Sequence, residues 1–309
     1  MSPPTRPRAA ASSASLRHRL AERGIDRMLL LLLPAVLFSL AMFIYPFIYG
    51  FGLTLQPTAA TQERWGAGIW SSYVAFFSDP FIFESIWLTL RLALPVALFN
   101  VLASIPVAFK LRGKFRGKRM LDTMLVLPIT LGTVMTAQGL LIFLGRQGWL
   151  NKALISLGII ERPLVLVMNY WGVVFSLVIS GFPFAFLLIS SYLSGIDPSI
   201  EAAARTLGAN RLQRLRYILL PLLAPGLATT FILTFVLAFS VFPSARLVGD
   251  AMGETRVMAL MAYRAFGEQN DYSMASTIAI MMGVVQLVVI LLVLAWRSLL
   301  YKGSTGGKG

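Results

Sequence analysis

The sequence contains no cysteine and a single histidine, His18, near its N-terminus. These absences exclude a disulfide framework, thiol catalysis and a zinc site built from cysteine and histidine. Charged residues are also scarce: they make up 13% of the 309 residues, whereas a soluble domain contains about 25%. Hydrophobic residues make up 57%, and the mean hydropathy is +0.75. The composition indicates a polytopic membrane protein.

Six hydrophobic runs are long enough to cross a bilayer, which takes about 20 helical residues. The first, at 28–57, carries no charge and is too long for the core of a signal peptide, so we interpret it as a retained span. Five more are expected at about 81–109, 120–144, 164–193, 221–241 and 272–296. We predict an all-α fold of six transmembrane helices: a first span, a membrane domain at 81–297, and tails at 1–27 and 298–309. Five prolines inside the runs are expected to kink the helices: Pro46, Pro95, Pro106, Pro128 and Pro183.

The positive charge follows the membrane topology. Of the 27 lysines and arginines, 19 lie in the N-terminal tail, the loop at 110–119, the segment at 194–220 and the C-terminal end from Arg297. The alternate loops hold the other eight beside eight acids. Because cytoplasmic loops are enriched in lysine and arginine, both termini and segment 194–220 are expected in the cytoplasm. The net charge of +14 is thus a topology signal rather than a nucleic-acid-binding surface.

The segment at 194–220 is polar although it lies between two hydrophobic spans. Asp197 and Pro198 are typical of a helix start, because one supplies a capping acceptor and the other presets φ. Gly208 can end this helix in a left-handed conformation, and Asn210 can cap a second short helix. The pattern predicts an elbow of two helices joined at a glycine.

The second helix of this elbow is expected to have an apolar side. Leu212, Leu215 and Leu219 have the spacing of one helical stripe, and Pro221 would begin the fifth span. An elbow of this kind could rest on anionic lipid as an interfacial hairpin, or it could bind a protein in the cytoplasm.

Enzymatic constellations are missing. The hydrophobic runs hold no pair of carboxylates at helical spacing, and the two Gly–Lys segments, at 113–118 and 303–308, lack the spacing of a phosphate-binding loop. We therefore expect that the chain is not an enzyme and binds no cofactor or metal ion itself. No acid lies in the middle of a run, which argues against an ion-coupled secondary carrier.

Neutral polar side chains inside the runs have two interpretations. The common one is hydrogen bonding between packed helices, and the other is the lining of a translocation path. The candidates for such a path are Thr133, Thr136, Asn169, Ser176 and Ser180.

The elbow resembles the EAA loop of type I (MetI-like) permease subunits of ABC importers. That motif has a glycine, nine further residues and then Ile-x-Leu-Pro, which here are Gly208, Ile218, Leu220 and Pro221. Tyr45-Pro46, Gly148-Trp-Leu-Asn151 and Pro183-Phe184 are similar to other parts of the family. One departure is that the glutamate usually found six residues before the glycine is Ala202 here, with Glu201 one position earlier.

The resemblance implies a transport subunit in the bacterial inner membrane. It implies two ATPase subunits that bind ATP and Mg²⁺, a second and different permease subunit, and an extracytoplasmic solute-binding protein. It further implies that the elbow contacts the ATPase through Glu201, Ala202, Ala203, Arg205, Gly208, Ala209, Arg211, Leu215, Ile218 and Pro221.

Within that superfamily, segments 203–209 and 219–226 look most like the spermidine/putrescine-type branch, which also has relatives that import ferric iron, thiamine, opines and phosphonates. The resemblance therefore leans towards a polyamine. A secondary carrier and a membrane scaffold that recruits a soluble partner are the competing classes of function.

Overall fold

The protein is described by a computed structural model in which residues 27–66, 68–113 and 116–300 are placed. The predicted N-terminal tail, apart from Arg27, and residues 301–309 of the predicted C-terminal tail lie outside these residues. The described chain is helical and contains no strand. Its elements are α2 Arg27–Thr54, α3 Ala59–Trp65, the 3₁₀ turn Gly68–Trp70, α4 Ser71–Ser78, α5 Pro80–Leu111, α6 Lys118–Leu144, α7 Trp149–Ser156, α8 Tyr170–Ser194, α9 Pro198–Thr206, α10 Arg211–Arg214, the π-helical turn Leu215–Leu219, α11 Leu220–Phe239, α12 Pro243–Leu247, α13 Met258–Gly267 and α14 Tyr272–Leu300.

The prediction of six transmembrane helices is confirmed within this described part of the chain. Six helical stretches there are long and apolar enough to cross a membrane, and they correspond in order to the six hydrophobic runs. The first, α2, forms a unit of its own, and the other five belong to the unit that begins at Thr54.

The fourth span begins later than expected. We predicted a start near residue 164, but α8 begins at Tyr170, because Asn169 caps it there. The Asn169 Oδ1 accepts from the Gly172 N–H at 2.9 Å, and its Nδ2 donates to the Val165 carbonyl at 2.8 Å. The predicted helix was therefore too long, because the apolar residues before the capping Asn169 are not helical.

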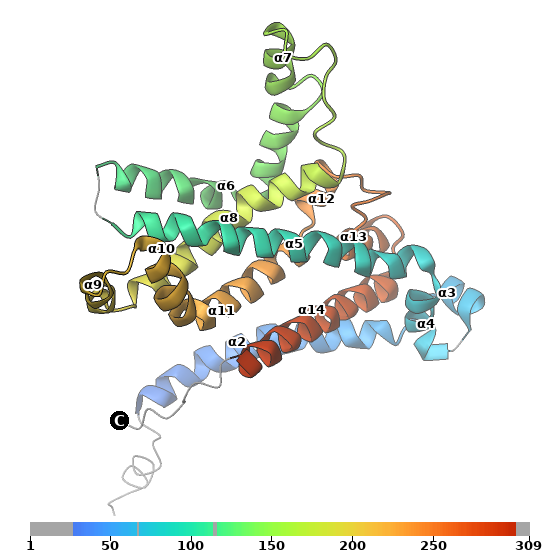
Figure 1. Cartoon of the computed structure of the whole chain (residues 1–309). Helices are drawn as coiled ribbons and strands as arrows, with labels where there is room; N and C mark the ends of the chain where they lie inside the picture. The colour runs from blue at the N-terminus through green and yellow to red at the C-terminus, as the bar shows by residue number, and fades with distance from the viewer. Residues whose placement is uncertain (1–26, 67, 114–115, 301–309) are drawn as a thin grey trace, which may run out of the picture. The chain divides into compact units, whose positions relative to one another are not determined.

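The third span is interrupted, although the hydrophobic run is continuous. Gly132 has φ +69° and ψ 167°, a conformation that only glycine adopts readily, and Figure 1 shows the two parts of α6 running in different directions. The interruption lies four residues beyond Pro128, where we had expected a kink. The Thr136 hydroxyl donates to the Gly132 carbonyl at 2.8 Å and so satisfies a backbone acceptor at the break.

The centre of the larger unit is formed by α5, α8 and α11, which pack against one another (Figure 1). One cluster of buried apolar side chains extends from these helices to α4, α13 and α14 and includes Phe76, Phe235 and Met258. A second, which we call the elbow-end cluster, contains Val101, Ile105, Ala108 and Leu111 of α5, Phe186, Ile189 and Leu193 of α8, and Leu219 and Leu223. The elbow-end cluster packs α5, α8 and α11 together at the end of the bundle to which the elbow is attached.

Hydrogen bonds between buried polar side chains supplement this apolar packing. The Ser176 and Ser244 hydroxyls pair at 2.8 Å, as do those of Ser72 and Ser273. The Thr89 hydroxyl of α5 accepts from the Met258 N–H at the start of α13 at 2.9 Å. Such contacts stabilise helix association where water is absent.

Gly172 offers a test of this packing. A Cβ at this position would lie 2.5 Å from the Val248 carbonyl oxygen and 3.0 Å from the Val167 Cα, both of which belong to the backbone. Because overpacking costs about 1–3 kcal/mol, Gly172→Ala is expected to lower the thermal unfolding midpoint in detergent by a few degrees. Gly139→Ala is the control, since nothing lies within 4 Å of its Cβ. Equal midpoints for the two variants would contradict the close approach of α8 to Val248.

Candidate functional site

The elbow predicted from the sequence is present, and its first helix ends at Gly208. This residue has φ +82°, the left-handed region expected of a helix-ending glycine. The Ala209 N–H donates to the Ala204 carbonyl at 2.9 Å, and the Gly208 N–H donates to the Arg205 carbonyl at 3.0 Å. These two bonds form a Schellman motif, which satisfies carbonyls at the end of α9 and reverses the chain.

Side chains cap both helices of the elbow as predicted. The Asp197 carboxylate accepts from the Ser199 N–H at 2.8 Å, and this bond holds the pKa of the Asp197 carboxyl below its ordinary value. Asn210 and Gln213 form a reciprocal capping box, with both side-chain-to-backbone bonds at 2.8 Å.

The second helix of the elbow continues into the fifth span without a break, which corrects the expectation that Pro221 begins that span. Helical structure runs from Arg211 to Phe239. The ring of Pro221 removes a backbone donor and crowds the carbonyl four residues earlier. The chain responds with a π-helical turn at Leu215–Leu219, in which the Leu220 N–H donates to the Leu215 carbonyl.

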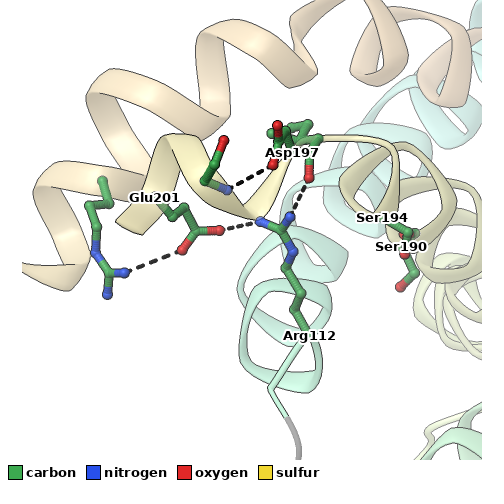
Figure 2. A network of polar contacts seen from close by, with 8 residues as sticks. Arg112, Ser190, Ser194, Asp197 and Glu201 are labelled. Atoms are coloured by element: carbon green, nitrogen blue, oxygen red, sulfur yellow. Dashed lines mark hydrogen bonds and ion pairs between the residues drawn. The ribbon is translucent and has the colours of Figure 1, made fainter. Parts of the chain in front are cut away.

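Glu201 lies at the centre of a cluster of charges that joins three segments of the chain (Figure 2). Its Oε1 contacts the Arg112 guanidinium at the end of α5, and its Oε2 lies 3.3 Å from Nη1 of Arg214 on α10. Arg112 also donates from Nη2 to the Ile196 carbonyl between α8 and α9. The side chains of Arg112, Glu201 and Arg214 are only 19%, 13% and 6% exposed. We call this set the elbow clamp.

The opposite side of the elbow is open. Leu207 is 87% exposed and Leu212 is 69% exposed. Small and basic residues of the same segment are exposed as well: Ala202, Ala203, Arg205, Gly208 and Arg211. We call these seven residues the elbow tip. Large apolar side chains that are exposed in a polar segment agree with either alternative expected from the sequence, contact with a partner protein or with lipid.

The predicted apolar stripe on the second helix is therefore wrong in part. Leu215 and Leu219 pack on the elbow-end cluster, but Leu212 points away from it. Arg214 is buried in its place, because the Glu201 carboxylate neutralises its charge.

The predicted ATPase-contact residues occupy different environments. Ala202, Ala203, Arg205, Gly208, Arg211 and Pro221 are exposed, whereas Glu201, Ala209, Leu215 and Ile218 are half-buried. The structure thus leaves the first group available to a partner and directs Glu201 inwards. The contact of these residues with an ATPase stays a prediction.

The pairing of Glu201 with Arg112 and Arg214 was not predicted from the sequence, nor was the exposure of Leu207 and Leu212. Arg112 was interpreted only as part of a basic loop. The displaced glutamate was the available signal, since one helical position turns a side chain by about 100°.

The five residues proposed for a translocation path differ in exposure, and four of them make hydrogen bonds within the protein. Asn169 caps α8, and Ser176 pairs with Ser244. The Ser180 hydroxyl donates to the Ser176 carbonyl at 2.8 Å, and Thr136 donates to Gly132. Only Thr133 is exposed. These bonds agree with the packing interpretation, and the translocation-path assignment stays a prediction.

Comparison with known proteins assigns the fold to a transport family. Residues 100–304, which extend from within α5 past the end of α14 and include the elbow, match the family described as "Binding-protein-dependent transport system inner membrane component". The chain belongs to this family. The permease is therefore a multi-pass inner-membrane component of an ABC importer, as its resemblance implied.

Individual relatives are named for different solutes. The permease is 28% identical to a probable sulfate transport system permease protein cysT of Prototheca wickerhamii, over 72% of this chain and 86% of that one. It is 31% identical to the spermidine/putrescine permease PotB of Haemophilus influenzae, over 56% of this chain and 61% of PotB. Both relatives are permeases, so the comparison supports the class of function and not the polyamine branch alone.

A solved structure has the same fold. A chain of the bacterial alginate ABC transporter, crystallised in complex with an alginate pentasaccharide-bound periplasmic protein, aligns with a TM-score of 0.76 over 94% of this chain and 99% of that one. The sequence identity is 21%, so the likeness shows the fold alone.

The capping box provides a test of how the elbow is built. Asn210→Ala removes the acceptor for the Gln213 N–H and is expected to cost about 1 kcal/mol. Hydrogen–deuterium exchange should then be several-fold faster across residues 211–214. Asn210→Ser retains a capping oxygen and should exchange at nearly the original rate. Unchanged exchange in the alanine variant would show that the cap does not hold the second helix.

Proposed function

We propose that this permease passes a small solute across the bacterial inner membrane and that separate ATPase subunits supply the energy by docking on the elbow tip. The observation that carries the proposal is the pair of exposed leucines on an elbow whose two helices are both capped. Leu207 and Leu212 would provide apolar contacts, and the exposed Arg205 and Arg211 add positive charge to the same segment. The interfacial-hairpin alternative is less well supported, because the elbow is anchored to the end of α5 by the elbow clamp.

The proposed mechanism is alternating access. Closure of two ATPases would displace the elbows of two permease subunits, and each elbow would act as a lever on its bundle. Since α10 continues into α11 as one helix, a displacement of the elbow tip reaches the central bundle directly. The solute would arrive from an extracytoplasmic binding protein. We place both termini in the cytoplasm on the basis of the lysine and arginine distribution.

The assembly is tested by purifying the subunit gently from its native membrane and identifying by mass spectrometry what remains bound. We expect a Walker-type ATPase and a second, different six-span permease. A subunit that emerges alone, and that does not stimulate hydrolysis by candidate ATPases, would contradict docking and favour a scaffold.

Transport by the assembled complex separates the classes of function. In proteoliposomes, uptake should require ATP on the cytoplasmic side and the binding protein on the other. Uptake driven by an ion gradient without ATP would instead identify a secondary carrier.

The solute is proposed to be a polyamine such as spermidine or putrescine, on the basis of the PotB relative. Sulfate is a second candidate, because the cysT relative aligns over more of the chain. Direct uptake of labelled spermidine, putrescine and sulfate distinguishes them. If none of these three solutes is taken up, ferric iron, thiamine, opines and phosphonates are the next candidates to be tested.

Substitution of Gly208 tests whether the elbow acts as a lever on the bundle. Gly208→Val places a β-branched side chain at φ +82°, which costs on the order of 1–3 kcal/mol. We expect the subunit to remain in the membrane while ATP-driven uptake falls about tenfold. Gly208→Asn is the matched control, because asparagine tolerates the left-handed region. Normal uptake by the valine variant would count against the lever.

A further inference from the structure

We propose that Glu201 is a positioning residue that fastens the first elbow helix to α5 and to the helical run that continues as α11, so that elbow and bundle move as one body. The inference rests on the proposed function, since it concerns how the movement of the elbow reaches the bundle. It assigns Glu201 an internal role in place of the direct ATPase contact that the family resemblance implies.

The first observation is that α9 has little apolar packing of its own. Of its nine residues, Ala204 is the one that is buried. Glu201 lies three positions before Ala204 and therefore shares its face, while Ala202, Ala203 and Arg205 are exposed. With so little buried surface, charge and hydrogen bonding must fix this helix.

The second observation is that the clamp reaches each central helix by a different route. Arg112 extends from the end of α5 to Glu201. The same guanidinium donates to the Ile196 carbonyl, two residues beyond the end of α8. Arg214 lies on the helical run that continues as α11. The Glu201 carboxylate therefore connects α9 with α5 and with the helical run that continues as α11, and Arg112 adds a contact to the segment after α8 (Figure 2).

The third observation is that the clamp adjoins the elbow-end cluster. Leu111 immediately precedes Arg112 and Leu215 immediately follows Arg214, and both leucines pack in this cluster. The charged contacts thus lie at the edge of an apolar core, where water screens them less than on an open surface. Glu201 could instead reach Arg205 at i+4, but Arg205 is exposed and the carboxylate points to the clamp.

Loss of the elbow clamp should allow the two helices of the elbow to move independently of each other. The second helix would still be joined to the bundle through the continuous run from Arg211 to Phe239. The first would be held by its chain ends and by Ala204, so part of each displacement would be lost as movement of α9 alone.

The functional test compares Glu201→Gln with wild type in the reconstituted complex. Glutamine keeps the size of the side chain and removes the charge. We expect assembly with the ATPase and ATP hydrolysis to persist, while solute transported per ATP falls about three- to tenfold. Arg112→Gln should lower the ratio in the same direction, and the double variant should lose less than the two single effects combined, because both single variants remove the Glu201–Arg112 pair.

Glu268→Gln is the matched control. It also removes an ion pair, between Glu268 and Arg264, but that pair is more exposed and lies in α13 and its end. Its transport per ATP should equal that of wild type. An unchanged ratio in both Glu201→Gln and Arg112→Gln would overturn the proposal.

A distance measurement tests the clamp independently of transport. Since the chain has no cysteine, spin labels can be placed specifically at Lys110→Cys on α5 and Ser199→Cys on α9, both exposed positions. With Glu201 present, we expect one narrow distance distribution with and without ATP. Glu201→Gln should broaden it.

The outcomes separate the two proposals. Identical distributions with glutamate and glutamine would overturn the clamp even if the complex transports solute. Absence of ATP-driven uptake in the wild-type complex, together with broadening in the variant, would overturn the proposed function and leave the clamp as a structural feature.

Discussion

The bilayer offers no hydrogen-bonding partner to the backbone, and the rest of the structure depends on this constraint. Long helices satisfy it because each N–H and C=O pairs within its own segment. Where the chain departs from an α-helix, another group takes over: the Thr136 hydroxyl at the Gly132 break, or the Leu215 carbonyl in the π-helical turn before Pro221. Outside the spans, the elbow meets the same requirement with the Asp197 cap, the Schellman motif at Gly208 and the capping box at Asn210.

The spans and the elbow could be predicted because their signals are local. Hydrophobic length identifies a span, and capping residues identify the ends of the elbow helices. The errors occurred where a tertiary contact or a backbone register decided the outcome. Nothing in the composition of 120–144 distinguishes Gly132 from another helical glycine, and the apolar run before Tyr170 conceals that Asn169 begins the helix. Pro221 looked like a start because the π-helical turn that accommodates it leaves no mark in the hydrophobic pattern.

The same distinction applies to the site. The motif spacing placed Gly208 and its neighbours correctly, since these are properties of one continuous segment. The partners of Glu201 could not be predicted, because Arg112 is 89 residues away and its charge has an equally good explanation in membrane topology. Burial of Arg214 beside exposed Leu212 reverses the usual preference of the two residue types, and only the position of the carboxylate explains it. Solute specificity is even less predictable from local patterns, because relatives with similar sequence identity to this chain are named for different solutes.

The continuous helical run from Arg211 to Phe239 affects how the bundle would change between the two states of the alternating-access mechanism. The run contains the π-helical turn at Leu215–Leu219 and a proline, Pro225, inside α11, but its helical backbone is continuous, so a push on the elbow also displaces side chains along α11. Leu223, Thr230 and Phe235 are buried on α11 among the ridges of its neighbours. Interdigitated ridges do not slide smoothly, because intermediate registers leave voids and clashes. We therefore expect the bundle to change in discrete steps between a few registers.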